Sequence, residues 1–69
     1  MPLTLAKKGA ALFVTKINGG DEVRRHLENL GFVAGCEVSV VNELMGNLIV
    51  RIKESRIAIS MEMAKRIFV

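Results

Sequence analysis

From Glu37 onward, apolar and polar residues alternate along the chain with a period of two. The apolar phase comprises Val38 and Val40, then Leu48, Val50 and Ile52, then Ile57 and Ile59. Such alternation predicts three β-strands that each bury one face. Residues 43–47 are predicted to form a hairpin loop in which Gly46 supplies a positive φ, and the polar residues 53–56 a second tight turn. The second half of the chain is therefore predicted to be a three-stranded meander.

A helical pattern precedes this meander. Val23, Leu27 and Leu30 recur at i, i+4 and i+7, which places them in one narrow apolar stripe. Asp21 is predicted to cap the first turn by accepting hydrogen bonds from free backbone N–H groups. Gly31 is predicted to end the helix by adopting the left-handed conformation. We therefore expect one short helix that packs on the strands through this stripe.

The segment before the helix is strand-like but irregular. Residues 10–17 are rich in β-favouring side chains, yet Ile17 is out of phase with the apolar residues before it. One extra residue in a strand shifts every later side chain to the other face. A bulge near Thr15 and Lys16 is therefore predicted to return Ile17 to the core.

The remaining segments complete a small barrel. Residues 1–8 are predicted to be a lead-in segment and a turn. Ser60 is predicted to cap a single helical turn, and residues 67–69 are predicted to form a closing strand. The predicted fold is mainly β: a small SH3-like, partly open barrel of about five strands, with one short α-helix inserted after the first strand. Residues 1–69 are expected to form a single domain.

Composition narrows the class of protein. The 69 residues carry a net charge of +3, and the basic residues are scattered rather than gathered in one block. Nucleic-acid binding usually requires a concentrated basic face, so no nucleic-acid partner is predicted. Cys36 is the single cysteine, which excludes an intramolecular disulfide and favours a cytoplasmic location. No apolar run approaches the roughly 20 residues that span a bilayer, so direct membrane insertion is not expected.

The residues do not form a constellation typical of an enzyme or a metal site. His26 and Cys36 are the only histidine and cysteine, so the chain is predicted not to be an enzyme. Glu22 and His26 would supply two metal ligands at most, and neither a dedicated iron site nor a cofactor is predicted. Gly20 and Asp21 are interpreted as a helix start rather than a phosphate-binding loop, because no Gly-Lys-Ser/Thr follows them. With no Trp or Tyr, and with the three Phe expected in the core, an aromatic groove for proline-rich ligands is not expected.

Apolar residues that lie outside the core-facing phase are candidates for a partner-binding surface. Leu44 and Met45 at the hairpin tip are the main ones, and Arg24 and Arg25 on the helix are predicted to supply a polar rim. Further apolar residues in this group are Phe13, Val41, Ile49 and Met61. The alternative is that the helix or the lead-in segment covers several of them. If they are exposed together, we expect the surface to bind a partner or a second copy of this chain.

A series of short motifs runs in one order along nearly the whole chain. They are Gly19-Gly20, then Leu27-x-x-Leu30-Gly31-Phe32-x-x-Gly35, then Ser55-Arg56-Ile57-Ala58-Ile59, then Ala64-x-x-Ile67-x-Val69. In these motifs the sequence resembles the FeoA family of ferrous-iron transport accessory proteins, with Ala34 in place of a proline found in family members. The resemblance implies an SH3-like barrel that acts in bacterial ferrous-iron uptake beside FeoB, a membrane transporter with a cytoplasmic GTP-binding domain.

This resemblance implies a small non-enzymatic accessory protein that binds the cytoplasmic part of FeoB. An alternative is the isolated C-terminal SH3-like barrel of an iron-dependent transcriptional repressor, since a similar barrel forms that domain. The sequence begins at Met1 without a linker, which favours a free-standing protein over this alternative. A small nucleic-acid-binding barrel is a third candidate, and it predicts an affinity that falls steeply with salt concentration.

Overall fold

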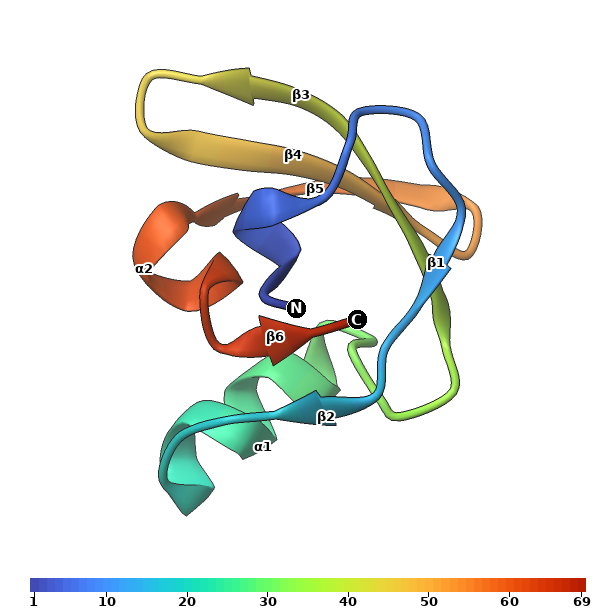
Figure 1. Cartoon of the computed structure of the whole chain (residues 1–69). Helices are drawn as coiled ribbons and strands as arrows, with labels where there is room; N and C mark the ends of the chain where they lie inside the picture. The colour runs from blue at the N-terminus through green and yellow to red at the C-terminus, as the bar shows by residue number, and fades with distance from the viewer.

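The computed structural model describes residues 1–69 and contains six short strands, two α-helices and one 3₁₀ turn (Figure 1). The elements in chain order are η1 (Leu3–Leu5), β1 (Leu12–Phe13), β2 (Lys16–Ile17), α1 (Asp21–Asn29), β3 (Glu37–Leu44), β4 (Asn47–Ile52), β5 (Ser55–Ser60), α2 (Met61–Ala64) and β6 (Ile67–Phe68). Strands β1, β3, β4 and β5 form an antiparallel sheet in this order, and β2 pairs with β6. This arrangement confirms the predicted mainly β, SH3-like fold with its short inserted helix.

The segment 10–17 is not the single bulged strand that its sequence predicts. Its two halves belong to different sheets, because β1 pairs with β3 whereas β2 pairs with β6. The Val14 N–H donates to the Cys36 carbonyl at 2.9 Å, and the next N–H, that of Thr15, donates to the Phe68 carbonyl at 2.7 Å. This change of sheet, rather than a bulge, turns both Val14 and Ile17 towards the core. It also raises the number of strands from the predicted five to six.

One core of twelve buried residues connects the two sheets and the helices. Its strand members in the meander follow the predicted alternation and are Val38, Val40, Leu48, Val50, Ile52 and Ile59. Leu3, Val14, Leu27, Phe32, Ala64 and Ile67 complete the cluster. Phe32 is fully buried, but Phe13 is 59% exposed, so the expectation that the core takes up all three Phe was wrong. The reason is that Phe13 lies on the outer face of β1, opposite Glu37.

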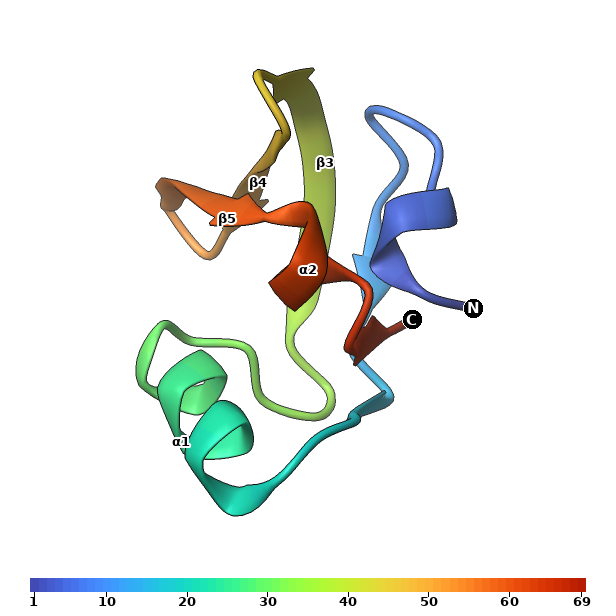
Figure 2. The same ribbon diagram turned by 90° about the vertical axis from the view of Figure 1, so that its left-hand side faces the viewer.

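Helix α1 lies at one end of the molecule, away from the β3–β4 hairpin in both ribbon views (Figures 1 and 2). Leu27 is fully buried and Val23 is half-buried, as the apolar stripe predicts. Leu30 follows the last helical residue and is 38% exposed, so two residues rather than three fasten the helix. Neither helix is long and apolar enough to cross a membrane.

The two ends of helix α1 differ in how well the sequence predicts them. The N-cap is Gly20, and no side chain caps the first turn, so the predicted Asp21 cap was wrong. Asp21 is instead the first helical residue, where its charge is favourable at the positive end of the helix dipole. At the other end, Gly31 has a φ of 109°, which confirms the predicted glycine ending.

The chain termini meet beside β6 (Figure 1). The Met1 ammonium group donates to the Val69 carbonyl at 2.9 Å, and the Val69 N–H donates to the Met1 carbonyl at 2.8 Å. The N-terminal segment is more than a lead-in, because Leu3 in η1 is fully buried. Near the C-terminus, the Ser60 hydroxyl accepts a hydrogen bond from the Met63 N–H at 3.2 Å, which confirms the predicted cap of α2.

Candidate partner-binding surface

The β3–β4 hairpin ends in a tight two-residue turn. Leu44 pairs with Asn47, so only Met45 and Gly46 connect the strands, and the loop is shorter than the predicted 43–47. Met45 has a φ of 52° and Gly46 a φ of 80°. The positive φ of Gly46 was predicted, whereas that of Met45 was not. Two positive φ values in a row are typical of the type I′ hairpin turn, which favours Asn-Gly or Asp-Gly.

A β-bulge at Val41 determines where Leu44 points. Val40 pairs with Val50, but the next pair along β4 is Ile49 with Asn42, so Val41 is the extra residue. Without the bulge, Leu44 would share the core-facing phase of Val40; with it, Leu44 lies on the outer face. The alternation of apolar and polar residues did not predict this bulge. The sequence contains one sign of the bulge: without it, the polar Asn42 would face the core in the same phase as Val38 and Val40.

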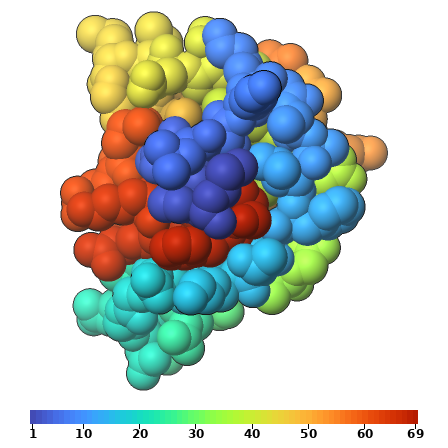
Figure 3. Space-filling model, in the orientation of Figure 1, coloured from blue at the N-terminus to red at the C-terminus, as the bar shows by residue number.

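The tip therefore presents two apolar side chains to solvent. Leu44 is 57% exposed and Met45 is 92% exposed. A left-handed conformation costs a residue with a Cβ atom about 1 kcal/mol, so the Met45 backbone is strained as well. A space-filling view shows the hairpin projecting at one corner of the molecule (Figure 3). The tip thus combines backbone strain with apolar exposure, neither of which stabilises the isolated chain.

The other apolar residues singled out in the sequence do not all join the tip. Ile49, beside Asn42 and Ala58 in the register, continues the outer face away from Leu44, and both Ile49 and Val41 are half-buried. Phe13 is exposed but lies opposite Glu37, at the far end of β3 from the tip. Met61 packs partly against the core. The exposed apolar surface at the tip is therefore small and centred on Leu44 and Met45.

Arg24 and Arg25 are both exposed, but they do not form a rim around the tip. They lie on helix α1, at the opposite end of the molecule from the β3–β4 hairpin (Figures 1 and 3). The expectation of one surface that contains all four residues was wrong, because the helix packs at the far end of the barrel. Arg24 instead lines an open hollow of about 410 Å³ together with Lys16 and Glu28.

The side chains that could ligate a metal are dispersed. No group of three or more His, Cys, Asp or Glu residues is close enough to hold a metal ion. His26 and Glu22 are both exposed on α1. Cys36 is half-buried, and its Sγ lies 3.8 Å from the Glu37 carbonyl oxygen. These three side chains therefore do not converge on one point of the structure.

The matches between this chain and known proteins extend over nearly all of its residues. The FeoA domain model matches residues 1–69. A relative from Methanocaldococcus jannaschii, provisionally named Fe(2+) transport protein A, is 34% identical over 68 residues, which cover 99% of this chain and 83% of the relative. A crystal structure of the iron uptake regulatory protein FeoA superposes with a TM-score of 0.88 at 29% identity and covers 97% of this chain and 91% of that one. FeoA of Stenotrophomonas maltophilia, solved in complex with zinc and described as a prokaryotic SH3 domain protein, gives a TM-score of 0.84 at 28% identity, with 99% and 87% covered.

The same barrel also occurs in a transcriptional regulator. A manganese-dependent transcriptional repressor superposes with a TM-score of 0.84, but at 18% identity and over 39% of its own length. A likeness at this identity shows a common fold, and a fold by itself does not determine function. The FeoA domain model, in contrast, matches every residue from 1 to 69. This chain belongs to the FeoA family, an SH3-like family associated with ferrous-iron transport.

Proposed function

We propose that this chain supports ferrous-iron uptake by binding the cytoplasmic part of the membrane transporter FeoB. Membership of the FeoA family supports a role in iron transport. In this proposal residues 1–69 act as one cytoplasmic domain without a catalytic step of their own. The hairpin tip, Leu44 and Met45, contacts the GTP-binding domain of the transporter.

The single observation that carries this proposal is that Met45 has both a strained backbone conformation and an exposed side chain. A strained, 92% exposed methionine occupies a turn position that Asn would fill without apolar exposure. The bulge at Val41 adds Leu44 to the same exposed surface. Departures from local sequence rules that no fold contact compensates are typical of functional sites. Burial of both side chains against an apolar patch of a partner would compensate for them, and the flexible Met45 side chain would adapt to the shape of that patch.

Binding of this kind affects transport only if it distinguishes between states of the transporter. A partner with equal affinity for two conformations leaves their populations unchanged. The chain therefore has to bind one state of the GTP-binding domain more tightly than the other. Its affinity for the domain is expected to differ between the GTP-bound and GDP-bound forms.

Arg24 and Arg25 form a separate part of the proposal. Because they lie at the other end of the molecule from the tip, we propose that they contact the transporter independently. Exposed charges at the edge of an interface mainly change the association rate. The double substitution Arg24→Glu and Arg25→Glu should lower that rate by up to about tenfold and leave the dissociation rate nearly unchanged.

The test is a calorimetric titration of this chain with the purified cytoplasmic domain of FeoB from the same organism, which measures the affinity between them. Leu44→Asp combined with Met45→Asp should weaken binding by about 30-fold or more, because charges buried in an apolar contact cost at least about 2 kcal/mol. The matched control is Val33→Asp, since Val33 is 42% exposed and lies beyond the end of α1. It should bind as tightly as the unmodified chain.

The stability of the tip variant and the binding of the unmodified chain complete the test. The circular dichroism spectrum and melting temperature of the tip variant should match those of the unmodified chain, because neither side chain belongs to the core. Binding by the tip variant as tight as that of the unmodified chain would show that the tip is not the contact surface. Absence of any binding by the unmodified chain to either nucleotide form would refute the proposed partner.

A further inference from the structure

Strand β5 ends the four-stranded sheet, so one of its edges has no strand beside it (Figure 2). All six of its residues pair with β4 in one continuous register without a bulge. The strand at the opposite edge, β1, is two residues long. A regular edge strand that lacks Pro and Gly is a ready template for pairing with another strand. The sheet therefore has one edge that is suited to strand addition.

The direction of the free backbone groups on β5 follows from one hydrogen bond. The Met61 N–H donates to the Gly46 carbonyl at 3.3 Å, directly beyond the last pair between β5 and β4. Antiparallel strands alternate between hydrogen-bonded and non-hydrogen-bonded pairs. Arg56 and Ala58 therefore belong to non-hydrogen-bonded pairs, and their N–H and C=O groups point to the free edge. Their side chains are exposed on the outer face.

The charge at this edge is not compensated within the molecule. Arg56 lies directly opposite Arg51 on β4. In a non-hydrogen-bonded pair the Cα atoms are only about 4.5 Å apart, and like charges directly opposite one another are destabilising. Neither arginine forms an ion pair, since the two ion pairs of the molecule join Glu62 to Lys65 and to Arg66. The fold thus contains a cross-strand repulsion that an acidic side chain from outside would relieve.

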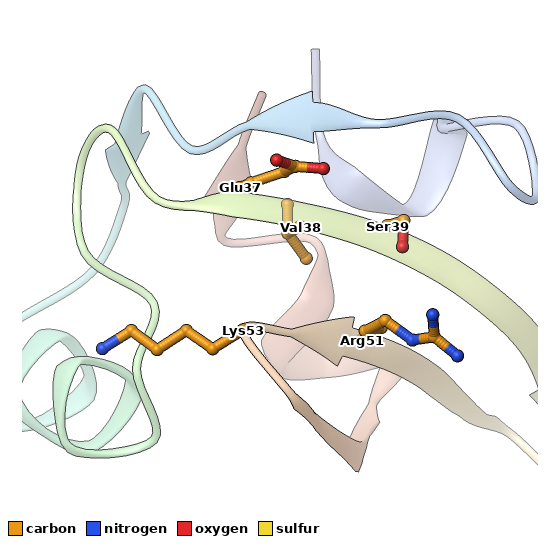
Figure 4. A pocket seen from close by; sticks show the side chains of 5 residues that line it. All are labelled: Glu37, Val38, Ser39, Arg51 and Lys53. Carbon is orange, nitrogen blue, oxygen red and sulfur yellow. The ribbon is translucent and has the colours of Figure 1, made fainter.

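Arg51 lines two hollows of the surface, and each of them is also lined by one lysine. Lys8 and Arg51 line one hollow of about 440 Å³, and Lys53, Arg51 and Glu37 line another of about 150 Å³ (Figure 4). In Figure 4, Lys53 and Arg51 extend in opposite directions from the end of β4. The neighbouring carboxylates are Glu37 and, in the β4–β5 turn, Glu54. Even without Lys53 and Glu54 in the turn, the cations Lys8, Arg51 and Arg56 outnumber the carboxylate of Glu37, so this side of the sheet is positively charged.

We propose that the free edge of β5 binds, by strand addition, an extended segment of a partner protein that alternates apolar and acidic residues. The backbone groups of Arg56 and Ala58 hydrogen-bond to the segment. Its apolar side chains lie beside Ile57, which is half-buried at the edge on the core-facing side. Its acidic side chains lie on the outer face beside Arg56 and Arg51. This site is separate from the hairpin tip and does not depend on the identity of the transporter.

The same cations do not favour a nucleic acid as the occupant. Single-stranded nucleic acids bind to basic surfaces that also offer aromatic rings for stacking. The exposed ring here, Phe13, lies on β1 at the opposite edge of the sheet. A phosphate backbone offers acceptors but no row of donors, so a nucleic acid would also leave the C=O groups of Arg56 and Ala58 without partners. An acidic strand uses both the charge and the edge.

The experiment uses the full chain and a short capped peptide that alternates glutamate and valine, with a fluorescent label for anisotropy. Ala58→Pro removes one N–H donor at the edge and no bond to β4, and it should weaken binding by about tenfold. The matched control Ala58→Val keeps the donor and should bind as the unmodified chain does. Arg56→Glu should also weaken binding by about tenfold and should acquire binding to a peptide in which lysine replaces glutamate. That gain keeps the test valid even if Ala58→Pro fails to fold.

Three results would overturn the proposal. The first is equal binding of a peptide of the same composition in which the glutamates and valines are grouped into blocks. The second is unchanged binding by a folded Ala58→Pro variant together with no gain by Arg56→Glu. The third is tight, salt-sensitive binding of a labelled single-stranded oligonucleotide without binding of the peptide, which would assign the basic side of the sheet to nucleic acid instead. The tip variant Leu44→Asp with Met45→Asp should bind the peptide normally, which separates this site from the proposed transporter contact.

Discussion

The two turns at the ends of β4 resemble each other at their first residue but differ at their second, because Gly46 also has a positive φ whereas Glu54 does not. Each joins its strands through two residues and places a side chain at a positive φ, 52° for Met45 and 56° for Lys53. Lys53 is charged and hydrated, so its turn is an ordinary solvated connection. Met45 exposes an apolar side chain instead, next to a leucine that a bulge directs outwards. A left-handed residue by itself does not mark a functional site, and our proposal for the tip therefore rests on its coincidence with apolar exposure.

The largest expected effect concerns the two faces of the hairpin that carries Met45. Leu48 is 4% exposed on the core face, whereas Leu44 lies on the outer face of the same hairpin. Leu48→Ala should lower the free energy of unfolding by about 3 kcal/mol, because it leaves a cavity in the core. Leu44→Ala should change it by less than about 0.5 kcal/mol. Urea denaturation of both variants measures the difference, and comparable losses would show that Leu44 is part of the core.

The next effect is a gain in stability at the tip. Met45→Asn places a residue that tolerates the left-handed conformation in the first position of an Asn-Gly turn. The free energy of unfolding should rise by about 1 kcal/mol as strain is relieved. Met45→Leu, which keeps both the Cβ atom and the apolar character, is the control and should give no gain. If Met45→Asn melts below the unmodified chain, Met45 contributes contacts that its exposure does not suggest.

The same substitution at the other turn tests whether the comparison holds. Lys53→Asn should raise the free energy of unfolding by about 0.5 kcal/mol, since the positive φ is similar but the lysine stem covers some neighbouring surface. Binding to the cytoplasmic domain of the transporter should stay unchanged. Loss of binding in this variant would remove the distinction between the two turns.

The smallest effect concerns the charges of the sheet near the Lys53 turn. Arg51→Glu turns the repulsion with Arg56 into attraction and should raise the free energy of unfolding by a few tenths of a kcal/mol at low salt. Arg51→Gln should give about half of this gain. Because exposed charges are screened, both gains should vanish in high salt. A gain that persists in high salt would point to packing rather than charge.

The sequence predicts the regular part of this fold well. Alternation identifies the core faces of β3, β4 and β5, because a sheet with one buried face requires a period of two. Ser60 and Gly31 are assigned correctly since capping and left-handed endings depend on local chemistry. Asp21 was misplaced by one position, because both Gly20 and Asp21 are compatible with a helix start and helix boundaries are uncertain by one or two residues.

The parts that the sequence did not predict depend on contacts distant along the chain. The change of sheet between β1 and β2 is set by partners on β3 and β6, which a local pattern does not contain. Leu44 and Met45 were found as exposed apolar residues, but the bulge that directs Leu44 outwards requires knowledge of the β4 register. The separation of Arg24 and Arg25 from the tip likewise depends on where helix α1 packs. Local patterns predict elements, whereas their relative placement follows from tertiary pairing.

The central claim is that the strained, exposed Met45 is kept for binding rather than for folding. The most direct measurement compares the melting temperature of Met45→Asn with its calorimetric affinity for the cytoplasmic GTP-binding domain of FeoB. We predict a higher melting temperature and an affinity reduced by about tenfold or more, since the loss of a central apolar contact costs more than about 1.4 kcal/mol. A variant that is more stable and binds as tightly as the unmodified chain would contradict the claim.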